Sequence, residues 1–229
     1  AAPDAWPPAA HARGQPLRAD DAPPLADSLR LAAAAWTAFR GGHSLDRALA
    51  EAAAVIAPPP HPRAAAAAKD IAYTAVRHLA LIEAMQHQLA HRAPAPSVAG
   101  LLAVALGQLL SDRRAEYTVV DQAVRAAAAQ RETRAASGFV NAVLRNFLRR
   151  PPGRRTEGKR RPDVALTAPR WWIDLVRAAE PDRFAGILQL QRQPPPLLLR
   201  VNRRGCGVAA YLQRLDREGF AASQVGPSA

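Results

Sequence analysis

Apolar residues recur at helical spacing along most of the chain, and the pattern is clearest over residues 137–149. Apolar pairs return there every three to four positions, which places one broad apolar stripe on a helix. The stripe consists of Phe139, Val140, Val143, Leu144, Phe147 and Leu148. Two small residues one turn apart, Gly138 and Ala142, favour the close approach of a neighbouring helix, and prolines at 151 and 152 end the element. We therefore predict a core helix of a bundle, with a basic C-terminal end.

The chain before this helix carries the same periodicity, interrupted by glycine and proline. The first helix is predicted to start after an N-cap residue, Asp27 or Ser28, and to end at the glycine pair 41–42. Ser44 is expected to cap the second helix, which three prolines end at 58–60. Each boundary therefore rests on a break in the apolar pattern and on a residue that favours that break.

Three more segments complete the helical part of the chain. Residues 64–91 form either one long helix or two helices that meet near His78. A further helix over 97–110 is apolar on almost every side, which predicts a position at the centre of the bundle. Residues 117–129 form another helix. No strand pattern occurs in this part, so an all-α bundle is expected.

Shifts in composition predict the domain organisation. Residues 1–25 are rich in proline and alanine without an apolar period, and are expected to form a disordered leader. Residues 26–150 hold the bundle, 151–165 form a basic linker, and 166–229 begin a small module that is cut short. The fold class is mainly α: an all-α helical bundle followed by the start of a small α/β (α+β) module.

The last module combines helix and strand patterns. Helices are expected to open near residues 168 and 181. Residues 197–202 are predicted to form a strand, 208–218 an amphipathic helix, and 220–225 a second strand.

Two motifs resemble one known family. Gly-Phe-Val-Asn-Ala-Val-Leu-Arg-Asn at 138–146 resembles the signature helix of the NusB-like fold, in the form found in bacterial 16S ribosomal RNA cytosine-5 methyltransferases of the Sun/Fmu family. Pro-Arg-Trp-Trp from residue 169 and Pro-Pro-Pro-Leu-Leu-Leu-Arg-Val-Asn at 194–202 resemble the segment that joins this domain to the catalytic half of those enzymes. The resemblance implies a NusB-like domain over residues 28–149 that docks a methyltransferase onto 16S ribosomal RNA.

The resemblance also implies S-adenosylmethionine as the cofactor of the parent enzyme and a cysteine nucleophile that attacks the cytosine ring. This chain has no glycine-rich strand-to-helix turn, no Asp-Ala-Pro-Cys and no Thr-Cys. Its single cysteine, Cys206, stands before the positions of the family's catalytic pair. We therefore expect neither a catalytic residue nor a cofactor site on this chain, which would be an N-terminal portion without activity of its own.

Two other functions remain open at this stage. The helices alone also fit a NusB-type transcription antitermination factor, which binds RNA together with a ribosomal protein. The segment 194–202 argues against it, because free-standing NusB factors have no such segment. A helical interaction scaffold is the third possibility, since a GC-rich genome also enriches a sequence in arginine and alanine.

Charge bears on the choice between these functions. The chain holds 31 Lys and Arg against 19 Asp and Glu, a formal net charge of +12, and such a field attracts nucleic acid. Arginine forks onto phosphate oxygens, so shape and phosphate recognition of RNA are expected. The candidate RNA-binding residues are Arg30, Arg113, Arg114, Arg145, Arg149, Arg150, Arg154, Arg155, Lys159, Arg160 and Arg161.

The sequence does not support a disulfide, a metal site or a membrane span. One cysteine excludes an internal disulfide and favours a reducing, cytoplasmic setting. His87 and His91 are four residues apart on one helix, but no acidic or cysteine partner lies nearby in the sequence, so no metal site is expected. No apolar stretch is long enough to span a bilayer. We expect a monomer that binds RNA without a membrane or a metal.

Overall fold

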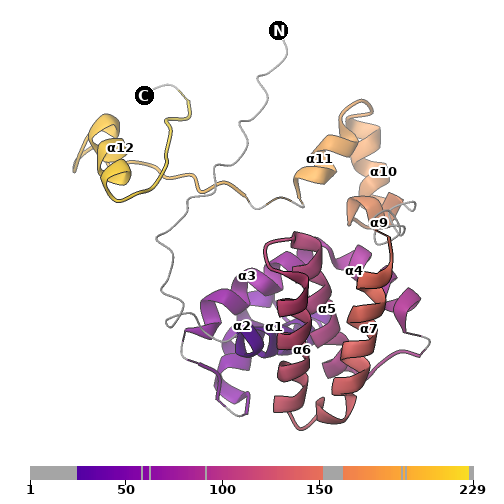
Figure 1. Ribbon diagram of the computed structural model, residues 1–229. Helices are drawn as coiled ribbons and strands as arrows, with labels where there is room; N and C mark the ends of the chain where they lie inside the picture. Colours follow the sequence, from indigo (N-terminus) through magenta and orange to yellow (C-terminus); the bar gives the residue numbers. More distant parts are fainter. Residues whose placement is uncertain are drawn as a thin grey trace. The chain divides into compact units, whose positions relative to one another are not determined.

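The computed structural model describes residues 25–57, 59–61, 63–90, 92–151, 162–191, 193 and 195–226. The described residues form helices and contain no β-strand. The helices are α1 (Leu25–Arg40), α2 (Leu45–Val55), α3 (Ala64–Arg77), α4 (Leu79–Leu89), α5 (Pro96–Ser111), α6 (Glu116–Ala129), the 3-10 turn η2 (Arg134–Ala136), α7 (Ser137–Arg149), α9 (Pro162–Leu166), α10 (Arg170–Ala179), α11 (Phe184–Leu190) and α12 (Val208–Arg217). Figure 1 shows α1 to α7 gathered in one bundle.

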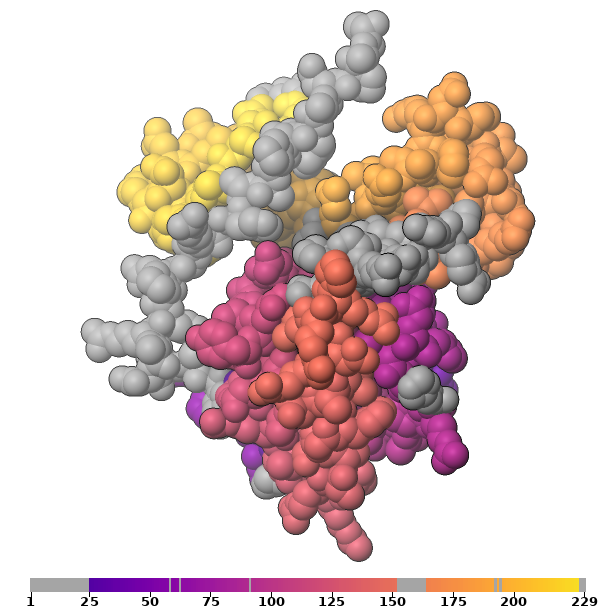
Figure 2. All heavy atoms as spheres, turned by 45° about the vertical axis from the view of Figure 1, so that its right-hand side comes forward, coloured from indigo at the N-terminus to yellow at the C-terminus, as the bar shows by residue number. Residues whose placement is uncertain are grey.

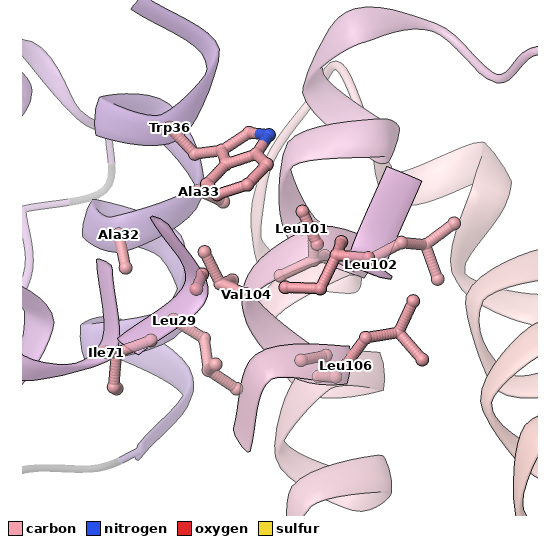
Figure 3. Close-up of a cluster of buried hydrophobic side chains, with 14 of the residues drawn as sticks. Leu29, Ala32, Ala33, Trp36, Ile71, Leu101, Leu102, Val104 and Leu106 are labelled. Carbon is pink, nitrogen blue, oxygen red and sulfur yellow. The ribbon is translucent and has the colours of Figure 1, made fainter. Parts of the chain in front are cut away.

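Helix α5 is the centre of this bundle, as its all-round apolar pattern predicts. Residues 100–108 are all buried, and α5 contacts α1, α3, α4, α6 and α7. A helix without a polar face is stable only when neighbours cover all its sides. Figure 3 shows part of the resulting core, in which side chains of α1 and α3 meet those of α5: Leu29, Ala32, Ala33, Trp36, Ile71, Leu101, Leu102, Val104 and Leu106.

Two glycines of α5 allow this close packing. A Cβ atom on Gly100 would lie 2.7 Å from the carbonyl oxygen of Ala33 in α1, and one on Gly107 would lie 3.1 Å from the Cα of Ala75 in α3. The close approach predicted at Gly138 of α7 is wrong, because nothing lies within 4 Å of the position where its Cβ would be. Gly138 and Ala142 are both exposed. The small residues that matter for packing are on the buried central helix.

The helix boundaries confirm most of the expected breaks. Residues 64–89 form two helices, α3 and α4, which meet at His78. Helix α1 ends at Arg40, and Gly42 follows with φ of 98°, a conformation that favours glycine. Ser44 occupies the N-cap position of α2, although its side chain makes no capping hydrogen bond.

The predicted start of α1 is wrong. The helix begins at Leu25, so both proposed N-cap residues lie inside its first turn. The Asp27 carboxylate accepts hydrogen bonds from the Arg30 guanidinium and from the backbone N–H of His61, which precedes α3. Ser28 is buried, and its hydroxyl has no hydrogen-bond partner among the described residues. The Asp27 carboxylate therefore bonds to a residue one turn on and to one far away in the sequence, and it does not cap the helix.

Helix α7 covers residues 137–149, as predicted. Val140, Val143, Leu144 and Phe147 are buried in the bundle. Phe139 is 39% exposed, so the buried stripe is narrower than the sequence pattern indicates. The helix contacts α4, α5 and α6, and Figure 2 shows its outer face at the front of the bundle.

Helices α9, α10 and α11 continue the same compact unit, which spans residues 23–193. Val164 of α9 joins the core of the bundle, and α9 contacts α4. A smaller apolar cluster forms beside it from Leu166, Ala168, Ile173 and Leu188, with Trp172, Val176 and Phe184 packed against it. The helices expected near residues 168 and 181 are present as α10 and α11.

The described residues 195–226 belong to a second unit. Its one helix, α12, was expected at 208–218 and spans Val208–Arg217. The strands predicted at 197–202 and 220–225 are wrong: both segments lack regular structure. An extended segment becomes a strand only when a neighbouring strand pairs with its backbone, and the described residues supply none. Leu197, Leu198 and Leu199 are accordingly exposed.

Candidate nucleic-acid interface

The exposed face of α7 carries positive charge without acidic neighbours in the sequence. No Asp or Glu occurs between Glu132 and Glu157, a stretch that holds six arginines. Arg145 and Arg149 stand four residues apart on α7, so they project from the same side of the helix, and both are exposed. The dipole of the helix places partial negative charge at its C-terminal end, which stabilises Arg149 in the last turn.

The two arginines differ in how they are held. The Arg145 Nε donates a hydrogen bond of 3.0 Å to the Oδ1 of Asn141, one turn earlier on α7. Arg149 has no hydrogen-bond or ion-pair partner among the described residues. Neither guanidinium is neutralised by a carboxylate in the described part of the chain. Both are therefore available to a phosphate.

Arg150 serves to join two helices. Its guanidinium donates to the Oε1 and to the backbone oxygen of Gln88, at 3.2 Å each. Gln88 lies in the last turn of α4, so these bonds fix the exit of α7 against that helix. A half-buried arginine with these contacts presents less of its charge to a ligand than Arg149 does.

Arg113 and Arg114 follow α5 and contact the bundle. The Nη1 of Arg113 lies 3.3 Å from Asp70 of α3, and this exposed pair is of the kind that contributes little to stability. The Nη1 of Arg114 donates to the Oε1 of Gln108 at 2.5 Å. Gln108 is 1% exposed, so Arg114 satisfies a polar group of the central helix.

Arg30 is 2% exposed and forms an ion pair of 2.9 Å with Asp27. A guanidinium buried at this depth does not reach the phosphate backbone of a macromolecular ligand, so Arg30 is not part of the exposed basic surface. Arg154, Arg155, Lys159, Arg160 and Arg161 lie outside the described residues. They follow the end of α7 directly in the sequence.

A groove between α6 and α7 adds an aromatic side chain that sequence reasoning missed. Its volume is about 960 Å³, and its lining includes Tyr117, Val120, Asp121, Asn141, Arg145 and Leu148. Tyr117 is 79% exposed. The sequence predicts only that Tyr117 begins a helix, and the packing of α6 against α7 shows that its ring lies at the surface.

Elsewhere, titratable groups form surface ion pairs. Lys69 and Tyr73 of α3 both bond to the carboxylate of Asp46 of α2, at 3.0 and 2.9 Å. The hydrogen bond from Lys69, followed by that from Tyr73, lowers the pKa of Asp46 below its ordinary value. Arg47 lowers the pKa of Glu51 in the same way within α2. These pairs tie α2 to α3 or stiffen α2.

The described residues contain no group of three His, Cys, Asp or Glu side chains arranged to hold a metal ion. His87 is exposed, and His91 lies outside the described residues. None of the helices in the described part of the chain combines the length and the apolar character needed to cross a membrane.

Comparison with known proteins gives two family matches in order along the chain. Residues 31–149 match the NusB family, and residues 168–229 match the Methyltr_RsmF/B-like, ferredoxin-like domain. The first match ends at the last residue of α7. The second begins at Ala168 and covers α10 to α12, so the resemblance seen in the two sequence motifs is confirmed.

The chain is also similar to curated proteins that share one name. The chain is 32% identical over 158 residues to ribosomal RNA small subunit methyltransferase B of Pseudomonas syringae pv. tomato, covering 68% of this chain and 35% of the relative. The Pseudomonas putida protein of that name is also 32% identical over 158 residues, with 36% of it covered. The Sodalis glossinidius protein is 34% identical over 122 residues, which is 53% of this chain and 28% of the relative.

The chain thus aligns with about a third of the length of these relatives. The NusB match alone spans more than half of the 229 residues and coincides with helices α1 to α7. The chain belongs to the NusB family, in the arrangement in which the NusB domain precedes the ferredoxin-like domain of RsmF/B-like methyltransferases.

Proposed function

We propose that this chain is the RNA-binding portion of a small-subunit ribosomal RNA cytosine-5 methyltransferase, and that the outer face of α7 contacts 16S ribosomal RNA. The observation that carries the proposal is the coincidence of two features. A NusB domain and the RsmF/B-like ferredoxin-like domain occur in order, and the last helix of the NusB domain exposes Arg145 and Arg149 without a neutralising carboxylate among the described residues. The basic residues 154–161 extend this charge along the sequence.

An antitermination factor is the weaker proposal. A NusB domain by itself fits that role, but the match over residues 168–229 links the chain to methyltransferases. The relatives named above are likewise methyltransferases of small-subunit ribosomal RNA. Ribosomal RNA as the substrate would also place the protein in the cytoplasm.

The methyl transfer itself needs residues beyond those described here. S-adenosylmethionine is the expected methyl donor of the longer protein, and such a cofactor sits against a glycine-rich turn that follows a strand. The described residues contain no strand, and the chain has a single cysteine, Cys206, on a half-buried loop. These residues do not fit the cofactor, so the contribution proposed for this chain is to bind and orient RNA.

The experiment is a binding titration of the chain with fragments of 16S ribosomal RNA at several salt concentrations. Saturable binding to one or a few fragments, with an affinity that falls steeply as salt rises, is expected from phosphate contacts. Double-stranded DNA of equal phosphate content serves as the competitor. Equal affinity for DNA and for every RNA fragment would show that the charge alone attracts polyanions, and would overturn the proposal.

A further inference from the structure

The groove between α6 and α7 differs from the rest of the basic surface because its two sides carry different chemistry. The helices run antiparallel through η2, so the start of α6 faces the end of α7. The α7 side offers Asn141 and Arg145, with Arg149 one turn further on. The α6 side offers Glu116, Tyr117, Asp121 and Arg125. The α6 side therefore carries both signs of charge, whereas the α7 side carries no acid.

Charge decides which side of the groove a phosphate prefers. Asp121 pairs with Arg125 on its own helix, at 3.0 Å, so that this pair carries little net charge. A phosphate would be attracted to Arg145 on the opposite side, because α7 carries no carboxylate.

Tyr117 supplies an apolar surface beside this phosphate position. Tyr117 is 79% exposed although it lines the groove, and Val120, which lines the same groove, is 6% exposed. An exposed aromatic ring is a platform on which an unpaired base can stack, and such stacking is tolerant of sequence. The volume of about 960 Å³ falls within the range of roughly 300–1,000 Å³ that is typical of ligand sites.

We infer that this groove binds one unpaired nucleotide of single-stranded RNA, with its base on Tyr117 and its phosphate at Arg145. The inference rests on the proposed RNA-binding function and adds to it a preference for unpaired nucleotides. A base inside a duplex cannot reach the ring of Tyr117, because it stays stacked on its neighbours.

The test compares a short single-stranded RNA with the same strand in a duplex, by fluorescence anisotropy of the full chain. Tyr117→Ala is expected to weaken single-strand binding about 10-fold or more and to change duplex binding less than about 2-fold. Tyr117→Phe keeps the ring and is expected to retain single-strand affinity. Arg145→Gln should weaken both, since it removes a phosphate contact. Arg47→Gln, on the exposed face of α2, is the control for loss of one charge.

The outcomes separate the inference from the proposed function. Wild-type chain that binds no RNA would overturn both. RNA binding that Tyr117→Ala leaves unchanged would overturn the nucleotide site alone, and would assign the groove to a protein partner instead. Equal losses for single strand and duplex would also overturn it, because stacking acts only on unpaired bases. Circular dichroism of each variant checks that the helices are intact.

Discussion

Gly100 of α5 lies against the backbone of α1, so that a Cβ atom added to it would stand 2.7 Å from the carbonyl oxygen of Ala33 and 2.5 Å from the Oγ1 of Thr37. The Thr37 hydroxyl donates to that same carbonyl at 2.9 Å and lies 3.3 Å from the carbonyl oxygen of Pro96. The two helices are therefore in contact through main-chain atoms, with no room for a methyl group.

Gly100→Ala is expected to destabilise the fold by about 1–3 kcal/mol, because the helices must separate or Thr37 must leave its position. The measurement is urea denaturation followed by circular dichroism. Gly138→Ala is the matched control: the position is helical and exposed, and nothing lies within 4 Å of the added atom. It should be neutral, or stabilising by up to about 1 kcal/mol. Equal destabilisation by both would show that close packing at Gly100 is unimportant.

Arg114→Ala is expected to reduce stability by about 1–3 kcal/mol, because it leaves the buried Oε1 of Gln108 without its donor. The double variant Gln108→Leu with Arg114→Ala removes both polar partners and should recover part of that loss. Thermal unfolding of the two single variants and the double variant measures the coupling. Strictly additive losses would contradict the idea that the hydrogen bond between these side chains matters.

Asp46→Asn is expected to change the pH dependence of stability. The pKa of Asp46 lies below its ordinary value of 3.8 in the folded protein, chiefly because of its hydrogen bond from Lys69. The unfolded state therefore binds the proton more tightly, so this pair stabilises the fold above about pH 4 and loses its contribution as pH falls through the folded pKa. The stability difference between wild type and Asp46→Asn should be present at neutral pH and shrink as the pH falls below the ordinary pKa of the carboxyl.

Both proteins are unfolded with urea across this range of pH to measure the difference. Because Asp46, Lys69 and Tyr73 interact at the surface, high salt should shrink the stability difference at neutral pH. A stability difference that persists unchanged in strong acid would show that packing of the Asp46 side chain, and not its charge, causes the difference.

Arg145→Gln combined with Arg149→Gln is expected to lower the slope of log affinity for RNA against log salt by about 1–2, since each lost phosphate contact removes roughly one released counterion. The comparison needs binding curves at four or more salt concentrations. Arg30→Gln should leave the slope of the folded protein unchanged, because Arg30 is buried and paired with Asp27. An unchanged slope in the double variant would move the RNA contact away from α7.

The sequence predicts the helices well because their periodicity and their glycine and proline breaks are local. It correctly places α7 over residues 137–149 and α5 at the centre. Burial of a single polar residue is decided by how the helices pack, which the apolar period does not give. Arg30 is buried beside Asp27, and Arg114 donates to the buried Gln108, although both look like free surface arginines in the sequence. Tyr117 is the converse case, an aromatic residue that tertiary packing leaves exposed.

The strands predicted in the last module fail for a related reason. The leucines at 197–199 have the apolar character of a buried strand, but strand pairing depends on a second segment. Among the described residues no such segment is present, and the apolar pattern by itself does not reveal this.

The complete enclosure of α5 has a consequence for local opening of the fold. Its amide groups from Leu101 to Gln108 are covered by five other helices, so no single neighbour can move away and expose them to water. Hydrogen exchange at these amides must therefore wait for global unfolding, and their protection measures the full free energy of unfolding. Amides of the exposed side of α2 exchange after a smaller opening. A binding partner that slows exchange in α5 thereby stabilises the whole bundle, whatever surface it touches.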